Sequence, residues 1–337
     1  MPHFSAPLPR RPLMTWMTAA LALGCAAAVL PARAQTHAWP DKTVRLIVPA
    51  PPASSLDVIA RALAERLKER WKQAVVIENK AGAGGMLGMD AVAKAAPDGT
   101  TLGVGFNGPI AFAPAMARKM AYDPARDLVP VVLTTIQPNV LAVPASNPAK
   151  DFAEFVAGAK KQGSSLSYGS VGIGSSSHLA MELLKATAGF EAVHVPYNGS
   201  PPAAASLAAG DTQMLLSTAP ALLALVQAGK VRMVAVTSAQ RYEGLKDLPT
   251  VAEAGYPGFE ALAWNGLFAP AGTPAEVVAK VNADVTAVLA EPEVKALLQR
   301  QGLAIGAPGN PASFKTFIEA ETRKWGAIIR KAGITTD

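Results

Sequence analysis

Serine and threonine residues gather at points where an expected strand passes into an expected helix. The first such segment is Pro49-Ala50-Pro51-Pro52-Ala53-Ser54-Ser55-Leu56-Asp57. Unpaired N–H groups at a helix start, neighbouring hydroxyls and the helix dipole together favour a carboxylate. Helix capping is an alternative compatible with this one, because Ser54-x-x-Asp57 fits a capping-box pattern. The candidate ligand contacts here are Pro52, Ala53, Ser54, Ser55 and Asp57.

Three further segments have the same character. Tyr168–His178 combines a glycine-rich turn with several serines, whereas capping alone needs one serine. Val195–Ser200 carries an aromatic ring and an amide, although an ordinary Asn-Gly turn accounts equally well for the amide. Ser217-Thr218-Ala219 places two hydroxyls at another strand-to-helix junction. The candidate contacts from these segments are Ser170, Gly174, Ser175, Ser176, Tyr197, Asn198, Ser217, Thr218 and Ala219.

None of these segments contains lysine or arginine. Anion recognition would therefore depend on neutral donors and bridging waters instead of an ion pair, which suits reversible capture and release. Gly103–Gly108 matches the dinucleotide pattern G-x-G-x-x-G, but Pro109 follows it and no acidic residue ends a following strand. We therefore expect no cofactor, and with three histidines and no cysteine in the mature chain we also expect no metal ion.

Ser175 and His178 raise the alternative of a periplasmic serine hydrolase. The chain has no G-x-S-x-G nucleophile elbow and offers no carboxylate for a triad. Beyond the N-terminal 34 residues the histidines are His37, His178 and His194, and His178 is expected to pack locally at a helix start. We therefore expect no catalytic residues.

The elements around these segments alternate between short β-rich runs and amphipathic helices, as in layered α/β proteins with parallel strands. A helix over 56–71 is indicated by apolar residues at three- and four-residue spacing. Strands are expected at 44–49, 74–79, 102–106, 139–143, 166–170, 192–195, 213–217, 231–237 and 261–269. Further helices are expected to end near 96 and 209, and to span about 151–161, 176–188, 219–228, 274–289, 292–301 and 311–331.

Two such α/β series, followed by a helical stretch, predict two lobes. The chain would cross between them near residues 135–140 and return near 255–262. Lobe 1 would comprise residues 35–137 and 260–337, and lobe 2 residues 138–259. Two crossings of this kind permit a cleft to close by hinge motion.

Residues 1–34 have the features of a cleaved signal peptide. Arg10-Arg11 precede an apolar run from Leu13 to Leu30, and Ala32-Arg33-Ala34 fits a signal peptidase site. An uncleaved anchor helix and twin-arginine export are alternatives. A lipoprotein anchored through Cys25 is a weaker alternative, because the residue three positions before this cysteine is Ala22 and not a large aliphatic residue. Cleavage would remove the one cysteine, so the mature chain would have no disulfide. We expect a periplasmic protein.

Composition and charge agree with a globular protein. Hydrophobic residues make up 50% of the chain and charged residues 17%. Three of the 31 basic residues lie in the signal peptide, which leaves 28 against 25 acidic ones. Without a dense basic face with interleaved aromatics, nucleic acid is not an expected partner.

Six short motifs are spread over almost the whole mature chain. They are Trp39-Pro40-x-Lys42-x-Val44-Arg45-Leu46-Ile47-Val48-Pro49, Asn79-Lys80-x-Gly82-Ala83-Gly84-Gly85, Ala95-x-Pro97-Asp98-Gly99-x-Thr101-Leu102, Val195-Pro196-Tyr197-x-Gly199, Leu248-Pro249-Thr250-Val251-x-Glu253-Ala254-Gly255 and Ala269-Pro270-x-Gly272-Thr273-Pro274. In this order they resemble the substrate-binding proteins of tripartite tricarboxylate transporters, the Bug-type receptors. Each motif alone is weak evidence for this family, but the six motifs together are specific for it.

The resemblance implies an α/β, two-domain periplasmic-binding-protein fold of the Venus flytrap type (type II). Such a receptor would deliver a small carboxylate (an organic acid, dicarboxylate, tricarboxylate or amino acid) to an inner-membrane permease. The family's ligand loops correspond to Pro52–Asp57, Ser170–Ser176, Tyr197–Asn198 and Ser217–Ala219. We expect a monomer without enzymatic activity. A periplasmic ligand sensor that feeds a signalling partner is the alternative.

One segment departs from the family pattern. The family has a glycine-rich run with a threonine between the proline pair and the aspartate, whereas this chain has Ala53-Ser54-Ser55-Leu56. The additional Cβ atoms would restrict how closely a ligand approaches the backbone, and the serines add donors. We therefore expect a different or smaller acid than the family's usual ligands.

Overall fold

The computed structural model describes residues 1–3 and 39–337, apart from residues 117–118, 308 and 336–337. The predicted signal peptide, its cleavage site at Ala32-Arg33-Ala34 and Cys25 lie outside the described residues. Within the described part of the chain, no helix combines the length and apolar character that a bilayer span requires.

The strands of the described chain form two sheets. The first has six strands in the order β11-β4-β10-β3-β1-β2, and the second has five in the order β7-β6-β8-β5-β9. The strands of the first sheet are β1 (Val44–Val48), β2 (Val75–Asn79), β3 (Thr101–Phe106), β4 (Leu128–Pro138), β10 (Leu262–Pro270) and β11 (Ala304–Ile305). Those of the second are β5 (Val140–Pro144), β6 (Ser167–Ser170), β7 (Val193–Pro196), β8 (Met214–Ser217) and β9 (Val231–Val236).

Both sheets are mixed, so the expectation of parallel strands is only partly confirmed. β1 runs parallel to β2 and β3, and β6 runs parallel to β7 and β8. In contrast, β10 is antiparallel to β3 and β4, and β5 is antiparallel to β8 and β9. The reason is connectivity: β4 passes into β5 with no helix between them, and β10 returns from the other sheet, so these strands are not part of strand–helix–strand units.

Most helices lie where the sequence predicts them. The longer ones are α2 (Ser55–Trp71), α3 (Met86–Ala93), α6 (Phe152–Gln162), α7 (Ser176–Ala188), α8 (Ser200–Ala209), α9 (Pro220–Gln227), α10 (Ala275–Ala290), α11 (Pro292–Arg300) and α12 (Pro311–Ala332). Short helical segments, which were not predicted, are η1 (Ala83–Gly85), η2 (Gly108–Phe112), α4 (Ala113–Met116), α5 (Pro124–Asp127), η3 (Gly163–Ser165) and η4 (Glu243–Leu245).

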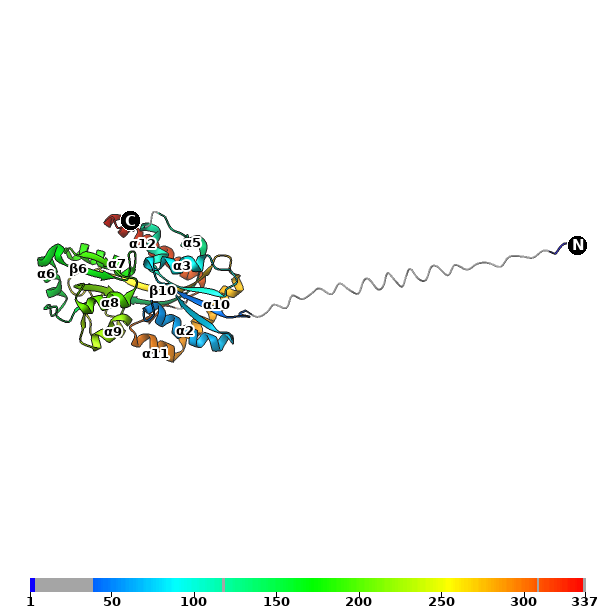
Figure 1. Cartoon of the computed structure of the whole chain (residues 1–337), viewed down its shortest axis with the longest axis horizontal. Helices are drawn as coiled ribbons and strands as arrows, with labels where there is room; N and C mark the ends of the chain where they lie inside the picture. Colours follow the sequence, from blue (N-terminus) through cyan, green and yellow to red (C-terminus); the bar gives the residue numbers. More distant parts are fainter. Residues whose placement is uncertain (4–38, 117–118, 308, 336–337) are drawn as a thin grey trace. The chain divides into compact units, whose positions relative to one another are not determined.

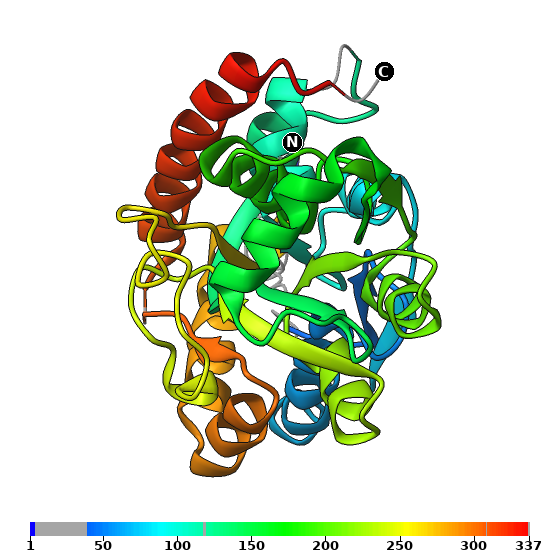
Figure 2. The same cartoon turned by 90° about the vertical axis from the view of Figure 1, so that its left-hand side faces the viewer.

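Helices cover both faces of each sheet, because successive side chains of a strand point to opposite sides. In β1, Leu46 packs in a core cluster with α2, α10 and α11, whereas Ile47 packs in a cluster with α3 and α12. In β5, Val140 packs with α8 and α9, whereas Leu141 packs with α6 and α7. Figure 1 shows α6, α8 and α9 at one end of the body and α2 and α10 toward the other. The long α12 runs along one side (Figure 2).

Helix α2 shows how local sequence signals set an element that positions the site. It begins at an N-cap, Ser54, whose side chain accepts the N–H of Asp57, and it ends at Lys72, which has a left-handed φ of 55°. The predicted apolar face is buried, namely Leu56, Ile59, Leu63, Leu67 and Trp71.

Strand β4 was not predicted, although its residues are rich in valine, threonine and isoleucine. Pro130 interrupts this run, and a proline argues against a central strand. The structure accommodates Pro130 at a register shift: Leu267 of β10 pairs with Val132, and the next residue, Phe268, pairs with Pro130. The short strand β11 was also not predicted.

The chain passes between the two sheets through segments that are hydrogen-bonded to each other. β4 ends at Pro138 and β5 begins at Val140, while the return runs from Val236 to Leu262. The N–H of Asn139 donates to Thr237 Oγ1 at 2.9 Å, and Thr237 Oγ1 donates to the carbonyl of Ala261 at 2.6 Å. The crossing segments therefore lie side by side.

Candidate functional site

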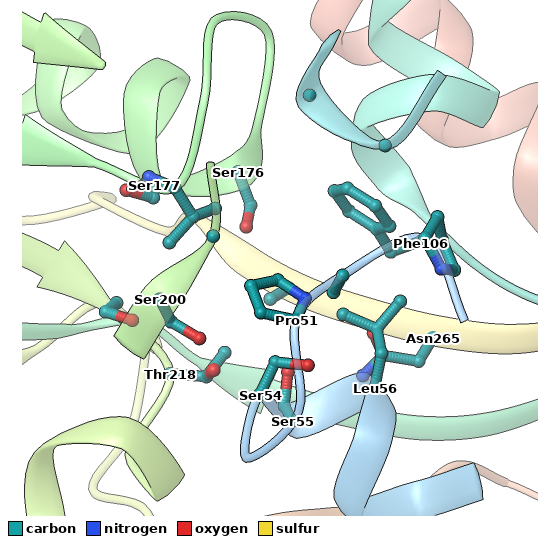
Figure 3. A pocket seen from close by; sticks show the side chains of 18 of the residues that line it. Pro51, Ser54, Ser55, Leu56, Phe106, Ser176, Ser177, Ser200, Thr218 and Asn265 are labelled. Atoms are coloured by element: carbon teal, nitrogen blue, oxygen red, sulfur yellow. Dashed lines mark hydrogen bonds between the residues drawn. The ribbon is translucent and has the colours of Figure 1, made fainter. Parts of the chain in front are cut away.

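A cavity lies where loops attached to the two sheets face each other. Its volume is about 50 Å³, and one water needs about 10–15 Å³, so the cavity has room for a small ligand. Hydroxyl groups from both sets of loops point toward this space (Figure 3). The polar lining residues are Ser54, Ser55, Asn107, Gln137, Asn139, Ser176, Ser177, Asn198, Ser200, Ser217, Thr218 and Asn265.

The start of α2 supplies free backbone donors to the cavity. The first-turn N–H groups of a helix have no intrahelical acceptor. The N–H of Asp57 bonds to Ser54 Oγ at 3.3 Å, while those of Ser55 and Leu56 have no acceptor within the described part of the chain. Ser55 and Leu56 both line the cavity. This end of α2 therefore offers donors and the positive end of a helix dipole.

Helices α7 and α8 also begin at the cavity, and the turn before α9 borders it. Ser176 and Ser177 are the first residues of α7, and Ser200 is the first of α8. Pro201 and Pro202 follow Ser200 and have no N–H, so Ser200 supplies the first backbone donor of α8. Thr218 precedes α9. The positive ends of three helices therefore converge on one small space.

The cavity wall carries no formal charge among the described residues. No lysine, arginine, histidine, aspartate or glutamate of this part of the chain lines it. A ligand here is surrounded by hydroxyls, amides, backbone N–H groups and a few apolar side chains such as Phe106 and Leu56. Neutral donors at helix starts stabilise an anion without an ion pair.

Asp57 does not line the cavity but holds the loop before α2. Its carboxylate accepts the N–H of Ala53 at 2.9 Å, Nε and Nη2 of Arg61 at 2.9 and 3.0 Å, and Nδ2 of Asn79 at 3.1 Å. Burial raises the pKa of Asp57, but the bonds from Arg61, Ala53 and Asn79 outweigh it, and the pKa lies below its usual 3.8. Asp57 is therefore a positioning residue.

Glycines allow the loops of the two sheets to meet above the cavity. A Cβ atom on Gly84 would overlap the carbonyl oxygen of Ile173, and one on Gly199 would overlap the ring of Pro51. Both glycines have left-handed φ angles, 62° and 116°, which side chains disfavour. Close backbone approach at these two points encloses the cavity.

The structure brings together six of the fourteen predicted site residues at the cavity. These are Ser54, Ser55, Ser176, Asn198, Ser217 and Thr218. The others lie outside the lining: Pro52, Ala53, Asp57, Ser170, Gly174, Ser175, Tyr197 and Ala219. Their predicted part in ligand binding therefore has no support from their position, and the binding role of the first six stays a prediction.

Several of these outlying residues are engaged elsewhere. Ser175 is the N-cap of α7; its Oγ donates to the carbonyl of Gly172 at 2.7 Å and accepts the N–H of His178 at 3.2 Å. The hydroxyl of Tyr197 bonds to Ser206. Pro52 and Ala53 are exposed. These residues shape the loops instead of contacting the cavity.

Behind the α7 loop lies a stack of three rings, of which Tyr168 and His178 are buried and His194 is half-buried. His178 and His194 stack with centroids 4.1 Å apart, and Tyr168 stacks on His194 at 4.8 Å. His178 Nδ1 accepts the N–H of Gly174 at 3.2 Å, and His194 Nε2 lies 2.6 Å from Ser170 Oγ. Burial lowers the pKa of His178 to about 4 and, with the neighbouring His178, that of His194 to about 3. Both imidazoles are therefore neutral supports of the loop.

The amides of Asn107, Gln137, Asn139 and Asn265 were not predicted as site residues. They come from β3, β4 and β10 or the turns next to them, and long-range strand pairing places them together. Ser177 and Ser200 were also missed, although they continue serine-containing segments. Among the described residues, no group of three metal-binding side chains is close enough to hold an ion.

Comparison with known proteins identifies close relatives. Residues 59–334 match the family described as "Tripartite tricarboxylate transporter family receptor". A protein from the tcbD-tcbE intergenic region of Pseudomonas sp. (strain P51) is 39% identical over 87% of each chain. Protein BugT of Bordetella pertussis is 32% identical over 95% of this chain and 98% of its own.

Solved structures with carboxylates are similar over their whole length. R. palustris Rpa4515 with adipate is 38% identical, with a TM-score of 0.85, over 88% of this chain and 99% of that one. MatC (Rpa3494) from Rhodopseudomonas palustris with bound malate is 33% identical, with a TM-score of 0.82, over 86% of this chain and all (100%) of that one. Both pairs share the two-sheet α/β architecture described above.

Proposed function

The chain belongs to the tripartite tricarboxylate transporter family of receptors, and on this premise we propose that it captures a small carboxylate in the periplasm. The ligand would then be delivered to an inner-membrane permease of the tripartite tricarboxylate type. The observation that carries the proposal is the convergence of the starts of α2, α7 and α8 on one enclosed, uncharged cavity. Free N–H groups and hydroxyls at helix starts complement a carboxylate.

The relatives support this ligand class. Rpa4515 was solved with adipate and MatC with malate. The small volume of the cavity, about 50 Å³, is our reason for proposing a short acid such as malate. The expectation drawn from Ala53-Ser54-Ser55, a different or a smaller acid than the family's usual ligands, stays a prediction.

We propose that each sheet is the core of one lobe, with residues 35–137 and 260–337 in lobe 1 and 138–259 in lobe 2. The crossing segments at Asn139 and Thr237–Ala261 would act as the hinge. Close contacts between loops at Gly84 and Gly199 agree with a closed arrangement. Small-angle scattering should show a more compact monomer once the ligand is added; an unchanged radius of gyration would contradict hinge closure.

Export by a cleaved signal peptide is part of the proposal. The mature chain would begin at Gln35, without Cys25 and without a lipid anchor. N-terminal sequencing of the protein recovered from a periplasmic extract tests this directly, and a lipidated Cys25 in the membrane fraction would contradict it.

We also propose that the protein has no enzymatic activity. Ser175, the candidate nucleophile, donates its proton to the Gly172 carbonyl instead of a histidine. Ser170 lies beside His194, but Ser170 is fully buried and does not line the cavity. Ester hydrolysis that disappears in Ser170→Ala or Ser175→Ala would overturn this part of the proposal.

Binding is best tested in two steps. Native mass spectrometry of the freshly purified protein identifies any co-purified ligand. Calorimetric titration of ligand-free protein with malate, succinate, lactate, adipate and a neutral sugar then establishes the class. We expect binding of at least one short acid and no binding of the sugar; the reverse pattern would refute a carboxylate receptor.

Matched serine variants locate the site. Ser55→Ala with Ser176→Ala removes one hydroxyl from each side of the cavity, and neither hydroxyl has a partner within the described chain, so we expect a loss of affinity of about 10-fold or more. Ser165→Ala is the control, because Ser165 is exposed and outside the cavity. Equal affinity in the double variant and the control would place the ligand elsewhere.

A further inference from the structure

Two buried asparagines present carbonyl oxygens whose orientation is fixed. Asn107 and Asn139 are fully buried and line the cavity. Nδ2 of Asn107 donates to the carbonyl of Leu262 at 3.1 Å, and Nδ2 of Asn139 donates to that of Ala261 at 3.2 Å. A backbone carbonyl can only accept, so the amide nitrogen must face it and the amides cannot be flipped. The other terminal atom of each amide, which does not face the backbone carbonyl, is therefore the oxygen Oδ1.

These oxygens have no hydrogen-bond partner within the described chain. Oδ1 of Asn107 and Oδ1 of Asn139 are both buried and unpaired. Gln137, at 1% exposure, lacks a partner for both Oε1 and Nε2, and Ser217 lacks one for Oγ. All four residues line the cavity. Buried polar groups in folded proteins are almost always satisfied, so such a concentration at one cavity points to a ligand.

The chemistry of the missing partner follows from the fixed oxygens. An ionised carboxylate has acceptors only and would be repelled by Asn107 Oδ1 and Asn139 Oδ1. A hydroxyl or an ammonium group can donate to them. No acidic side chain of the described chain lines the cavity, so a buried ammonium would have no counter-charge. A neutral hydroxyl fits better.

We propose that the receptor selects a short hydroxy acid, whose carboxylate is held by the helix starts and whose hydroxyl donates to the amide oxygens of Asn107 and Asn139. This inference rests on the proposed carboxylate-binding function. Gln137, whose amide has a donor nitrogen and an acceptor oxygen, both unpaired, can adapt to either end of such a ligand. Selection arises because a ligand without the hydroxyl leaves buried acceptors unsatisfied.

Two pairs of acids that differ by one hydroxyl test the proposal by calorimetry. Malate is compared with succinate, and lactate with propionate. We expect the hydroxy acid of at least one pair to bind about 10- to 100-fold more tightly than its partner. Equal affinities within both pairs, or tight binding of adipate alone, overturn the selection while leaving the carboxylate receptor intact. Aspartate binding more tightly than malate overturns the choice of hydroxyl over ammonium.

If none of these acids binds, the carboxylate function itself fails and the inference fails with it. If water molecules satisfy the amide oxygens, each hydroxy acid should bind with the same affinity as its partner without the hydroxyl. That result overturns the selection. The measurement on the unaltered protein therefore distinguishes the two failures without any variant.

Variants then assign the selection to the amides. In Asn107→Ala the preference for malate over succinate should shrink to about 3-fold or less, because one fixed acceptor is gone. Asn139→Ala, which removes the other fixed acceptor, is the second variant should Asn107→Ala not fold. Asn282→Ala is the matched control: Asn282 also donates to backbone carbonyls, those of Val131 and Gly309, but lies outside the cavity. A preference that persists in both cavity variants overturns the assignment.

Discussion

The carboxylate of Asp57 accepts the backbone N–H of Ala53 at 2.9 Å and thereby closes the turn that leads into α2. In this turn Ala53 has a φ of 64°, which is unfavourable for a residue with a Cβ atom. The charge-assisted bond from Ala53 to Asp57 thus stabilises a strained backbone at the entrance to the site.

The first prediction is that relieving the backbone strain at Ala53 stabilises the protein. Ala53→Gly should raise the stability by about 1 kcal/mol, because glycine adopts a left-handed conformation without a Cβ clash. The gain should appear as a higher midpoint in urea denaturation. Ala157→Gly, at an exposed position inside α6, should instead lose about 1 kcal/mol. A loss of the same size in both variants would contradict the strain argument.

The two neighbouring serines at the start of α7 should respond differently to substitution. Ser175 caps the helix with two hydrogen bonds, so Ser175→Ala should cost about 1–2 kcal/mol of stability. Ser176 lines the cavity and its hydroxyl has no partner within the described chain, so Ser176→Ala should weaken ligand binding about 3- to 10-fold with little change in stability. Urea denaturation measures the effect on stability, and calorimetry measures the effect on ligand binding. If Ser175→Ala weakened binding and Ser176→Ala lowered stability, Ser175 rather than Ser176 would face the cavity.

These serines also show what the sequence can and cannot predict. The strand–serine–helix junctions are local patterns, so α2, α7 and the cap at Ser54 were predicted correctly, whereas Ser175, predicted as a ligand contact, is the cap of α7. Which serine of a run faces the cavity depends on where the helix begins, and composition alone does not determine that. The amides of Asn107 and Gln137 meet through pairing of β3 and β4 with β10, more than 100 residues away along the chain. No local pattern marks such contacts.

Acid should destabilise the protein through His178, which is buried, and His194, which is half-buried. Their pKa values in the folded state, about 4 for His178 and about 3 for His194, lie below the usual 6.5. The unfolded chain therefore binds protons first as the pH falls below about 6.5, and stability is lost progressively down to pH 3–4. At pH 5.5 the loss should be about 1 kcal/mol for each histidine.

The measurement is urea denaturation at pH 7.5 and pH 5.5. In His194→Phe, which keeps a stacked ring but cannot titrate, the loss between these pH values should be smaller by about 1 kcal/mol. Ser165→Ala is the control, because Ser165 is exposed and does not titrate, so its substitution should leave the pH dependence unchanged. A variant at position 194 that follows the original profile would exclude this histidine as the cause.

The last prediction concerns the contact that encloses the cavity. Gly84 has a φ of 62° and lies against the carbonyl of Ile173, where a Cβ atom would overlap the oxygen. Gly84→Ala should therefore hold the two loops apart and weaken ligand binding by more than about 10-fold, since closure contributes to affinity. Gly333→Ala is matched in backbone strain, with φ and ψ of 64° and 26° against 62° and 25° at Gly84, but has no neighbouring atom within 4 Å of the added Cβ. Both variants should lose a similar amount of stability from the left-handed conformation, so a loss of affinity restricted to Gly84→Ala isolates the effect of closure. Equal affinities in the two variants would show that the loops need not meet at Gly84 and Ile173 for the ligand to be held.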